Sequence, residues 1–268
     1  MKTILYVTDF YYEAKGRKYY EEDLYITSQL KAHFNILIGH PHQVLSYLDI
    51  ADVLLFRNTG SVIGYQDYFD RFVALAKEKN ILTFNSFDGK ADIKGKQYLL
   101  DLMVLEYPII PTVNSLNKLD KLGNPKTYVV KLKNGADSIG MEFLTKEEVL
   151  KIDLKGRLIQ PYLDFEYEVS FYYLNNRIQY ALYAPNKDKR WDLQEYEATK
   201  DDLIFAEKFI QWNNMKRGIV RIDACRLKDN SLLLVEVEDL NPFLSLDALS
   251  EAKRNDFLGN FIAALQSL

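Results

Sequence analysis

The sequence contains little cysteine and histidine, no long hydrophobic run and no excess of basic residues. A single cysteine, Cys225, in 268 residues excludes a disulfide framework and a zinc site built on cysteines. No stretch approaches the roughly 18 uninterrupted apolar residues of a membrane-spanning helix, and the apolar start at 3–7 is too short for a signal peptide. We therefore expect a cytoplasmic protein with no membrane span.

The charge balance and the missing motifs argue against further classes of protein and of binding site. With 34 basic and 38 acidic residues the net charge is −4, whereas proteins held by nucleic-acid phosphates usually carry a basic stripe. His33, His40 and His42 have no acidic cluster beside them in the sequence, so we expect no histidine metal site. No G-x-G-x-x-G motif follows the first strand, and the P-loop spacing of Gly135 and Gly140 lacks the required Lys and Ser/Thr.

Hydrophobic periodicity divides the chain into two parts. The first ninety residues alternate strands and helices, which indicates a mainly parallel sheet with helices on both faces. The remainder favours short antiparallel strands with a few helices, and Asn175-Asn176 favours a two-residue hairpin turn because asparagine tolerates a positive φ. The predicted strands are 3–7, 35–39, 53–56, 81–84, 128–132, 140–144, 157–163, 166–174, 178–184, 219–227 and 231–237. The predicted helices are 21–34, 67–79, 93–105, 200–215 and 246–265.

Two charged strands near the C-terminus form the most informative pattern. If Asp229-Asn230 is a two-residue hairpin turn, Asp223 lies opposite Glu236 and Arg221 lies opposite Glu238. Because side chains alternate along a strand, all four charges then share one face. The other face, which we expect to be buried, carries Ile222, Ala224, Val235 and Val237.

This charged face has two interpretations. Facing carboxylates repel one another, and a divalent cation such as Mg²⁺ or Mn²⁺, which prefers oxygen ligands, removes the repulsion. Alternatively, the face is solvated, and Arg221 and Arg226 offset the acids. Likewise Lys131, which ends an apolar strand before a loop of small residues, is either a phosphate ligand or a solvated surface lysine.

These residues belong to a longer series of motifs that spans nearly the whole chain. The series runs through Leu54-Leu55-Phe56-Arg57, Asn85, Lys96-Gln97-Tyr98-Leu99-Leu100-Asp101-Leu102, Ile110-Pro111-Thr112, Val129-Val130-Lys131, Gln160-Pro161-Tyr162-Leu163, Glu168-Val169-Ser170, Arg221-Ile222-Asp223, Glu236, Glu238 and Pro242. In order and spacing it resembles the ATP-grasp superfamily, and within it the glutathione-synthetase-like and cycloserine-synthetase-like ligases.

The resemblance implies a fold and a domain plan. The fold class would be α/β plus α+β, an ATP-grasp fold with an N-terminal parallel α/β lobe and an antiparallel-sheet body that binds the nucleotide. Residues 1–92 would form the N-terminal lobe, residues 93–163 the small lobe and hinge, and residues 164–268 the C-terminal lobe with the metal site.

The resemblance also implies ligands and residue roles. The cofactors would be ATP and Mg²⁺ or Mn²⁺. Nucleotide contacts are implied for Lys96, Lys131, Ser138, Gln160, Tyr162, Leu163 and Glu168, and metal contacts for Asp223, Glu236 and Glu238. Arg221 and Arg190 would be catalytic. Arg57 and Asn241 would meet the substrate, although Asn241 stands where the cycloserine-synthetase-like branch commonly has an acid.

The implied activity is that of an ADP-forming carboxylate–amine ligase that works through an acyl phosphate. The substrate would be an amino acid, a peptide or a natural-product precursor, with no nucleic acid or membrane as partner, and a homodimer is compatible with the resemblance. Two alternatives stay open: a catalytically silent ATP-grasp regulator, and a small-molecule kinase that uses the same ATP site. The full set of basic and acidic site residues favours an enzyme, because nucleotide binding alone needs fewer of them.

Overall fold

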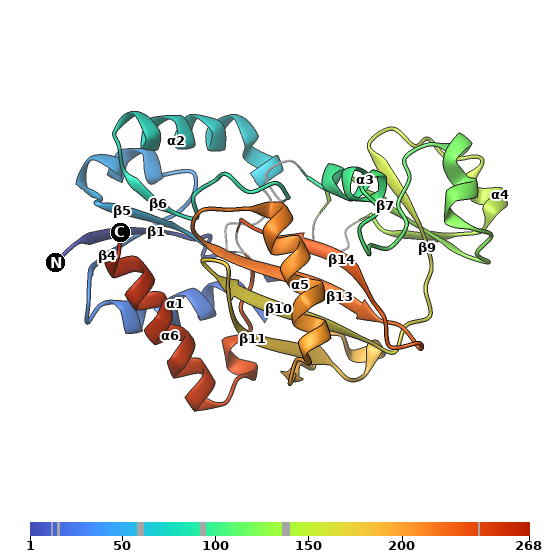
Figure 1. Cartoon of the computed structure of the whole chain (residues 1–268). Helices are drawn as coiled ribbons and strands as arrows, with labels where there is room; N and C mark the ends of the chain where they lie inside the picture. Colours follow the sequence, from blue (N-terminus) through green and yellow to red (C-terminus); the bar gives the residue numbers. More distant parts are fainter. Residues whose placement is uncertain (12, 15–16, 58–61, 92–94, 136–139, 241) are drawn as a thin grey trace.

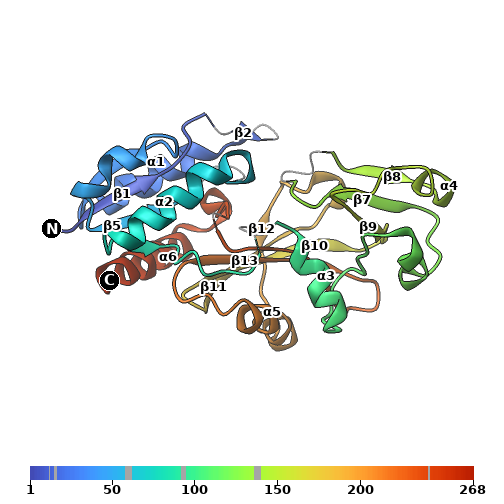
Figure 2. The same cartoon turned by 90° about the horizontal axis from the view of Figure 1, so that it is seen from above.

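The computed structural model describes residues 1–11, 13–14, 17–57, 62–91, 95–135, 140–240 and 242–268. Its three larger sheets follow one another along the molecule: an N-terminal sheet, a central sheet and a small-lobe sheet (Figures 1 and 2). The strands are β1 (Thr3–Val7), β2 (Glu13–Ala14), β3 (Arg17–Lys18), β4 (Asn35–Gly39), β5 (Val53–Phe56), β6 (Leu82–Phe84), β7 (Tyr128–Leu132), β8 (Glu142–Leu144), β9 (Arg157–Pro161), β10 (Tyr167–Leu174), β11 (Arg177–Ala184), β12 (Gln194–Glu195), β13 (Ile219–Arg226) and β14 (Leu232–Glu238). The α-helices are α1 (Tyr19–Leu30), α2 (Gln66–Glu78), α3 (Gln97–Val104), α4 (Lys146–Val149), α5 (Lys200–Asn213) and α6 (Glu251–Gln266). Among the helices that the structure describes, none combines the length and apolar character needed to cross a bilayer.

The N-terminal sheet is parallel, with strand order β4-β1-β5-β6, as the alternating strands and helices predicted. Ile4 and Val53 face α1 and α6 in one buried cluster, whereas Leu5 and Leu54 face α2 in another. Burial of both faces explains why β1 and β5 read as continuous apolar runs. Figure 1 shows α2 on one side of this sheet and α1 and α6 on the other. The C-terminal helix α6 therefore returns to complete the N-terminal core.

The central sheet is antiparallel, with order β12-β11-β10-β13-β14, and α5 covers one of its faces. Its β10–β11 hairpin turns at Asn175 and Asn176, whose φ angles are 46° and 63°. Asparagine tolerates such left-handed backbone, so the predicted two-residue turn at this position is confirmed.

The β13–β14 hairpin confirms the predicted pairing of its charged end but corrects the turn. Its loop is the three-residue segment 228–230, with Asn230 at a φ of 67°, instead of the two-residue turn at Asp229-Asn230. A bulge at Val235 then restores the register, so that Asp223 pairs with Glu236 and Arg221 with Glu238.

The bulge also changes which side chains face the core. Ile222, Ala224 and Val237 are buried as predicted, but the bulge turns Val235 away from the core, and Leu234 takes its place. The prediction for Val235 is therefore wrong.

The small-lobe sheet has strand order β8-β7-β9 and one buried face. Tyr128, Val130 and Ile159 pack with Leu119 and Val149 in a separate core cluster. Because side chains alternate along β7, Lys131 lies on the opposite face, toward the central sheet.

Two predicted helices begin several residues later in the structure. Helix α3 begins at Gln97 instead of residue 93, because Gly95 turns the chain just before it with a φ of +63°. The predicted helix 246–265 is a 3₁₀ turn, Leu246–Ala248, followed by extended backbone at Leu249 and then α6.

Removal of an aromatic ring from the shared core of α6 and the N-terminal sheet should destabilise the protein. Phe261 is 0% exposed, and its ring centroid lies 5.5 Å from that of Phe84 on β6. We expect Phe261→Ala to lower the free energy of unfolding in urea by about 3–5 kcal/mol. The same substitution at Phe143, which is 54% exposed, should cost below about 1 kcal/mol. Equal losses at the two positions would contradict this account of the core.

Candidate active site

The charged face of the β13–β14 hairpin is held together by Arg221. Its Nε and Nη2 donate to the two carboxylate oxygens of Asp223 at 2.8 Å each, and Nη2 also donates to Glu238 Oε1 at 2.5 Å. Ser170 on the neighbouring strand β10 donates to Asp223 Oδ1 at 2.7 Å. Arg226, in contrast, pairs with Asp202 of α5 and does not offset these acids. The side chains are largely buried, so the alternative of a solvated face does not describe them.

Two lysines from distant parts of the chain converge on Glu236. Lys96 forms an ion pair with Glu236, and Lys131 of β7 is close enough to affect the pKa of Glu236. The two lysine loops are joined by a backbone hydrogen bond from Lys96 N to Lys133 O at 2.8 Å. This bond holds the loop of Lys96, which lies 140 positions from Glu236 in the sequence, against the end of β7.

Burial and neighbouring charges lower the pKa of some groups in this cluster and raise the pKa of another. Burial and the nearby Lys96 lower the pKa of Lys131 to about 8. Burial opposes ionisation of Glu236, but Lys96 and Lys131 outweigh it and hold its pKa below the ordinary value. Burial together with the neighbouring Asp223 and Glu236 raises the pKa of Glu238 to about 8, although Arg221 acts against the shift. Such opposed shifts are frequent at functional sites.

The acidic residues of this cluster are also the predicted ligands of a metal ion. In the part of the chain that the structure describes, no three acidic, histidine or cysteine side chains already converge as a metal site. Asp223 and Glu238 are instead turned to Arg221, and Glu236 to Lys96. The donors are nonetheless all carboxylate oxygens, which Mg²⁺ prefers, and the raised pKa of Glu238 shows that its charge is not fully compensated. The residues therefore fit Mg²⁺ in their chemistry, provided that the basic groups exchange partners.

Glu168 and Arg190 form a pair at the edge of this cluster. Nε and Nη2 of Arg190 both lie 2.8 Å from Glu168 Oε2, and the charge of Arg190 contributes to the lowered pKa of Lys131. The structure thus brings these two predicted site residues together and places them near the lysines.

The predicted hinge residues lie at the end of β9 and in the segment that joins β9 to β10. Gln160 is buried and donates to Thr112 Oγ1 at 2.8 Å, so its side chain is committed within the small lobe. Tyr162 is 53% exposed, and its ring meets that of Phe143 at a centroid distance of 5.8 Å. Leu163, next along the segment, is partly buried.

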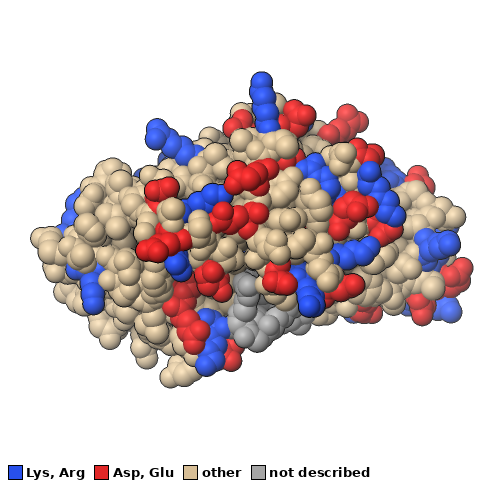
Figure 3. All heavy atoms as spheres, turned by 90° about the horizontal axis from the view of Figure 1, so that it is seen from below, with Lys and Arg blue, Asp and Glu red and all other residues tan. Residues whose placement is uncertain are grey.

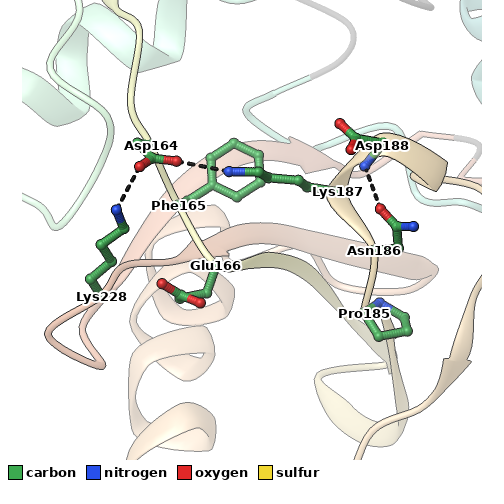
Figure 4. Close-up of a pocket in the computed structure, with 8 residues that line it drawn as sticks. All are labelled: Asp164, Phe165, Glu166, Pro185, Asn186, Lys187, Asp188 and Lys228. Atoms are coloured by element: carbon green, nitrogen blue, oxygen red, sulfur yellow. Dashed lines mark hydrogen bonds and ion pairs between the residues drawn. The ribbon is translucent and has the colours of Figure 1, made fainter.

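A pocket of about 340 Å³ opens beside this segment (Figure 4). Asp164 lies between Lys187 and Lys228, which approach it to 2.8 and 2.6 Å. These two bonds, together with the two lysine charges, lower the pKa of Asp164 to about 2. The contacts tie the linker to two loops of the central sheet. On the face shown in Figure 3, acidic and basic side chains are interspersed instead of gathered by sign.

Among the predicted site residues that the structure describes, Arg57 has its partners outside the cluster. Arg57 is 1% exposed, lies between Glu22 and Asp23, and donates to the carbonyl of Pro242 at 3.0 Å. Its guanidinium is therefore engaged within the protein, and the substrate contact stays a prediction. Ser138 and Asn241 lie outside the described residues.

Sequence reasoning assigned no role to Asp239, which anchors the loop before Lys96. Asp239 is buried, and its Oδ2 accepts a hydrogen bond from Ala91 N at 2.9 Å. A Cβ atom at Gly89 would approach that oxygen to 2.2 Å, so a glycine is required there. The signal available in the sequence was an acid directly after Glu238, together with a glycine in the loop that follows Asn85.

Comparison with known proteins finds similarity in structure but no match in sequence. No family model matches the sequence, and no curated protein matches it. D-cycloserine synthetase DcsG superposes with a TM-score of 0.69 at 16% identity over 97% of this chain and 99% of that chain. The chain has the ATP-grasp fold.

Two further structures with the ATP-grasp fold carry ligands. D-alanine–D-alanine ligase from Bacillus anthracis complexed with ATP superposes with a TM-score of 0.67 at 14% identity, over 100% of this chain and 95% of that chain. The ATP-grasp ligase PsnB, complexed with a phosphomimetic precursor variant, Mg and ADP, gives a TM-score of 0.67 at 12% identity, over 98% and 97%. At these identities the likeness establishes the fold alone, and the parallel N-terminal sheet followed by antiparallel sheets is part of it.

The lowered pKa of Lys131 predicts an unusual pH profile for its chemical labelling. A neutral amine reacts with acylating reagents, so its labelling should rise through pH 8 and then level off. In the urea-unfolded protein, where the side chain is no longer buried beside Lys96, labelling of Lys131 should instead gain about tenfold per pH unit up to about 10. Peptide mass spectrometry after brief labelling measures the Lys131 site in both states. Parallel profiles for Lys131 in the folded and unfolded protein would contradict the proposed environment of Lys131.

Proposed function

We propose that the protein is a Mg²⁺- and ATP-dependent carboxylate–amine ligase that forms ADP and an acyl-phosphate intermediate. The observation that carries the proposal is the convergence of Lys96 and Lys131 with three carboxylates and Arg221 at one point between the small lobe and the central sheet. ATP-dependent ligases with this fold supply the reaction class by analogy.

The basic residues have distinct roles in this proposal. Lys96 and Lys131 hold phosphate oxygens of ATP, and Lys96 exchanges the carboxylate of Glu236 for the phosphates. Arg221 stabilises the acyl phosphate and the oxyanion formed when the amine attacks, because its planar fork can bind two oxygens at once. Phosphoryl transfer depends mainly on such positioning and charge neutralisation.

The acidic residues complete the site. Asp223, Glu236 and Glu238 would hold Mg²⁺, which would supply neutralisation of phosphate charge. Glu168 and the hinge segment 160–163 bind the ribose and adenine, and Arg190 contacts phosphate or substrate once it leaves Glu168. The exposed rings of Phe143 and Tyr162 add an apolar surface beside the hinge.

The substrate class is an amino acid, a peptide or a natural-product precursor. D-cycloserine synthetase and D-alanine–D-alanine ligase are named for small amino-acid-derived products, whereas PsnB is seen with a precursor peptide. Product analysis distinguishes the ligase from a kinase with the same ATP site, since a ligase releases ADP and phosphate and a kinase leaves the phosphate on its product.

Nucleotide binding should depend on the metal and raise the melting temperature. At about one hundred times Kd, bound MgATP adds about 2.7 kcal/mol, or roughly 5–10 °C for a chain of this size. We expect this rise with MgATP and a much smaller one with ATP plus chelator, measured by differential scanning fluorimetry. Asp223→Asn combined with Glu236→Gln should remove the Mg²⁺ dependence. No rise at millimolar MgATP would refute both the ligase and the kinase.

Substitution of Arg221 should separate turnover from nucleotide binding. Arg221→Lys keeps the charge but loses the bidentate fork, so we expect ADP release to fall about 100-fold while the MgATP midpoint stays within about threefold. The assay is ADP release with panels of carboxylates and amines. As a control, Arg177→Lys makes the same arginine-to-lysine change at an exposed position of β11. It should leave both ADP release and the MgATP midpoint unchanged. Equal loss of binding and turnover would contradict the assigned role of Arg221.

A further inference from the structure

The segment Pro242–Leu246, which directly follows the charged hairpin, is held from two sides. Glu22 of α1 accepts the N–H of Leu244 at Oε1 (2.9 Å) and the N–H of Leu246 at Oε2 (3.1 Å). Arg57, which follows β5, donates to the carbonyl of Pro242 at 3.0 Å. The N-terminal lobe thus fixes the backbone of this segment through groups that are almost fully buried.

The same two groups are bound to each other and to the N-terminal sheet. Arg57 Nη2 lies 3.3 Å from Glu22 Oε1, and Arg57 Nε lies 3.5 Å from Asp23. Asp23 in turn accepts from Tyr6 and Thr8 at the end of β1. A buried and hydrogen-bonded network of this kind fixes its members in one arrangement.

On its other side the segment meets Arg221. Arg221 Nη1 donates to the carbonyl of Phe243 at 3.1 Å, while the rest of the guanidinium binds Asp223 and Glu238. The ring of Phe243 stacks on Tyr19 of α1 at a centroid distance of 4.4 Å. One carbonyl oxygen therefore links the catalytic guanidinium to a segment whose position is set by the N-terminal lobe.

We infer that Glu22 and Arg57 are positioning residues for Arg221, which they orient through the segment Pro242–Leu246. The inference gives Arg57 a role other than the substrate contact expected from the sequence. It also assigns to the N-terminal lobe a control over the orientation of the Arg221 guanidinium. Its consequence for turnover rests on the proposed function, whereas its structural content does not.

The Nε–H group of Arg221 offers a direct readout in solution. It donates to Asp223, and its signal in a ¹⁵N-correlated spectrum of the full chain is identified by its loss in Arg221→Lys. We expect Glu22→Gln to speed hydrogen exchange of this Nε–H, and of the Leu244 and Leu246 amides, about fivefold or more. The cause is that a side-chain amide sets an NH₂ group against one of the two backbone N–H donors.

Two further variants keep the experiment decisive. Glu21→Gln makes the same substitution at the adjacent residue, whose side chain is 65% exposed, and should leave all three signals unchanged. Tyr19→Leu removes the ring stacked on Phe243 and leaves Glu22, Asp23 and Arg57 in the sequence, so it tests the segment if Glu22→Gln does not fold. An unchanged Arg221 signal in a folded variant of Glu22 or Tyr19 overturns the inference.

The rate measurement separates this inference from the proposed function. Glu22→Gln should lower ADP release at saturating MgATP about tenfold or more, while the MgATP midpoint stays within about threefold. A purely structural role would lower the melting temperature and leave the Arg221 signal and the rate unchanged. If the wild-type protein binds no MgATP, the proposed function fails, but the exchange measurements still decide whether Glu22 orients Arg221.

Discussion

The guanidinium of Arg221 is the group that allows three carboxylates to share one face of a hairpin. Asp223 and Glu236 are paired across the ladder, and Glu238 lies two pairs further along on the same face, so their charges oppose one another at short range. Arg221 binds two of the three acids, and Lys96 binds the third. Because Lys96 precedes α3 and its loop is bonded to the end of β7, compensation of these acids also draws the small lobe onto the central sheet.

The register of that hairpin was predictable because two deviations from the simplest hairpin cancel. The loop contains one residue more than the turn expected at Asp229-Asn230, and the bulge at Val235 takes up the difference. Charge pattern and alternation therefore identified the paired acids correctly, whereas the inner face was wrong at Val235. A bulge leaves little trace in a sequence, since it changes the facing of a few residues and leaves the strand signal intact.

Lys96, Lys131, Glu168 and Arg190 were recognisable from local motifs, and the structure brings them together. The fold followed from the same evidence: strand alternation gave the parallel sheet, and turn residues such as Asn175-Asn176 gave the antiparallel body. Arg57 was not predictable in this way, because its partners lie far away in sequence, at Glu22 and Pro242. Burial of a charged residue depends on such distant partners, and the spacing of residues in the sequence does not reveal them.

Under the proposed function, the charges of the cluster indicate how the site would accept a nucleotide together with a metal ion. Arg221, Lys96 and Lys131 carry +3, and the three ionised carboxylates would carry −3, so the cluster is neutral when every acid is ionised. Proton binding by Glu238, whose pKa is raised to about 8, leaves a net positive charge near neutral pH. Polyphosphate would then meet an excess of basic groups. A divalent cation would favour the ionised form of Glu238, so metal and phosphates would each replace partners that the protein already provides for one another. In the free protein, the acidic and basic groups of the site pair with one another. Under the proposed function, the metal ion and the phosphates replace these ion pairs when they bind.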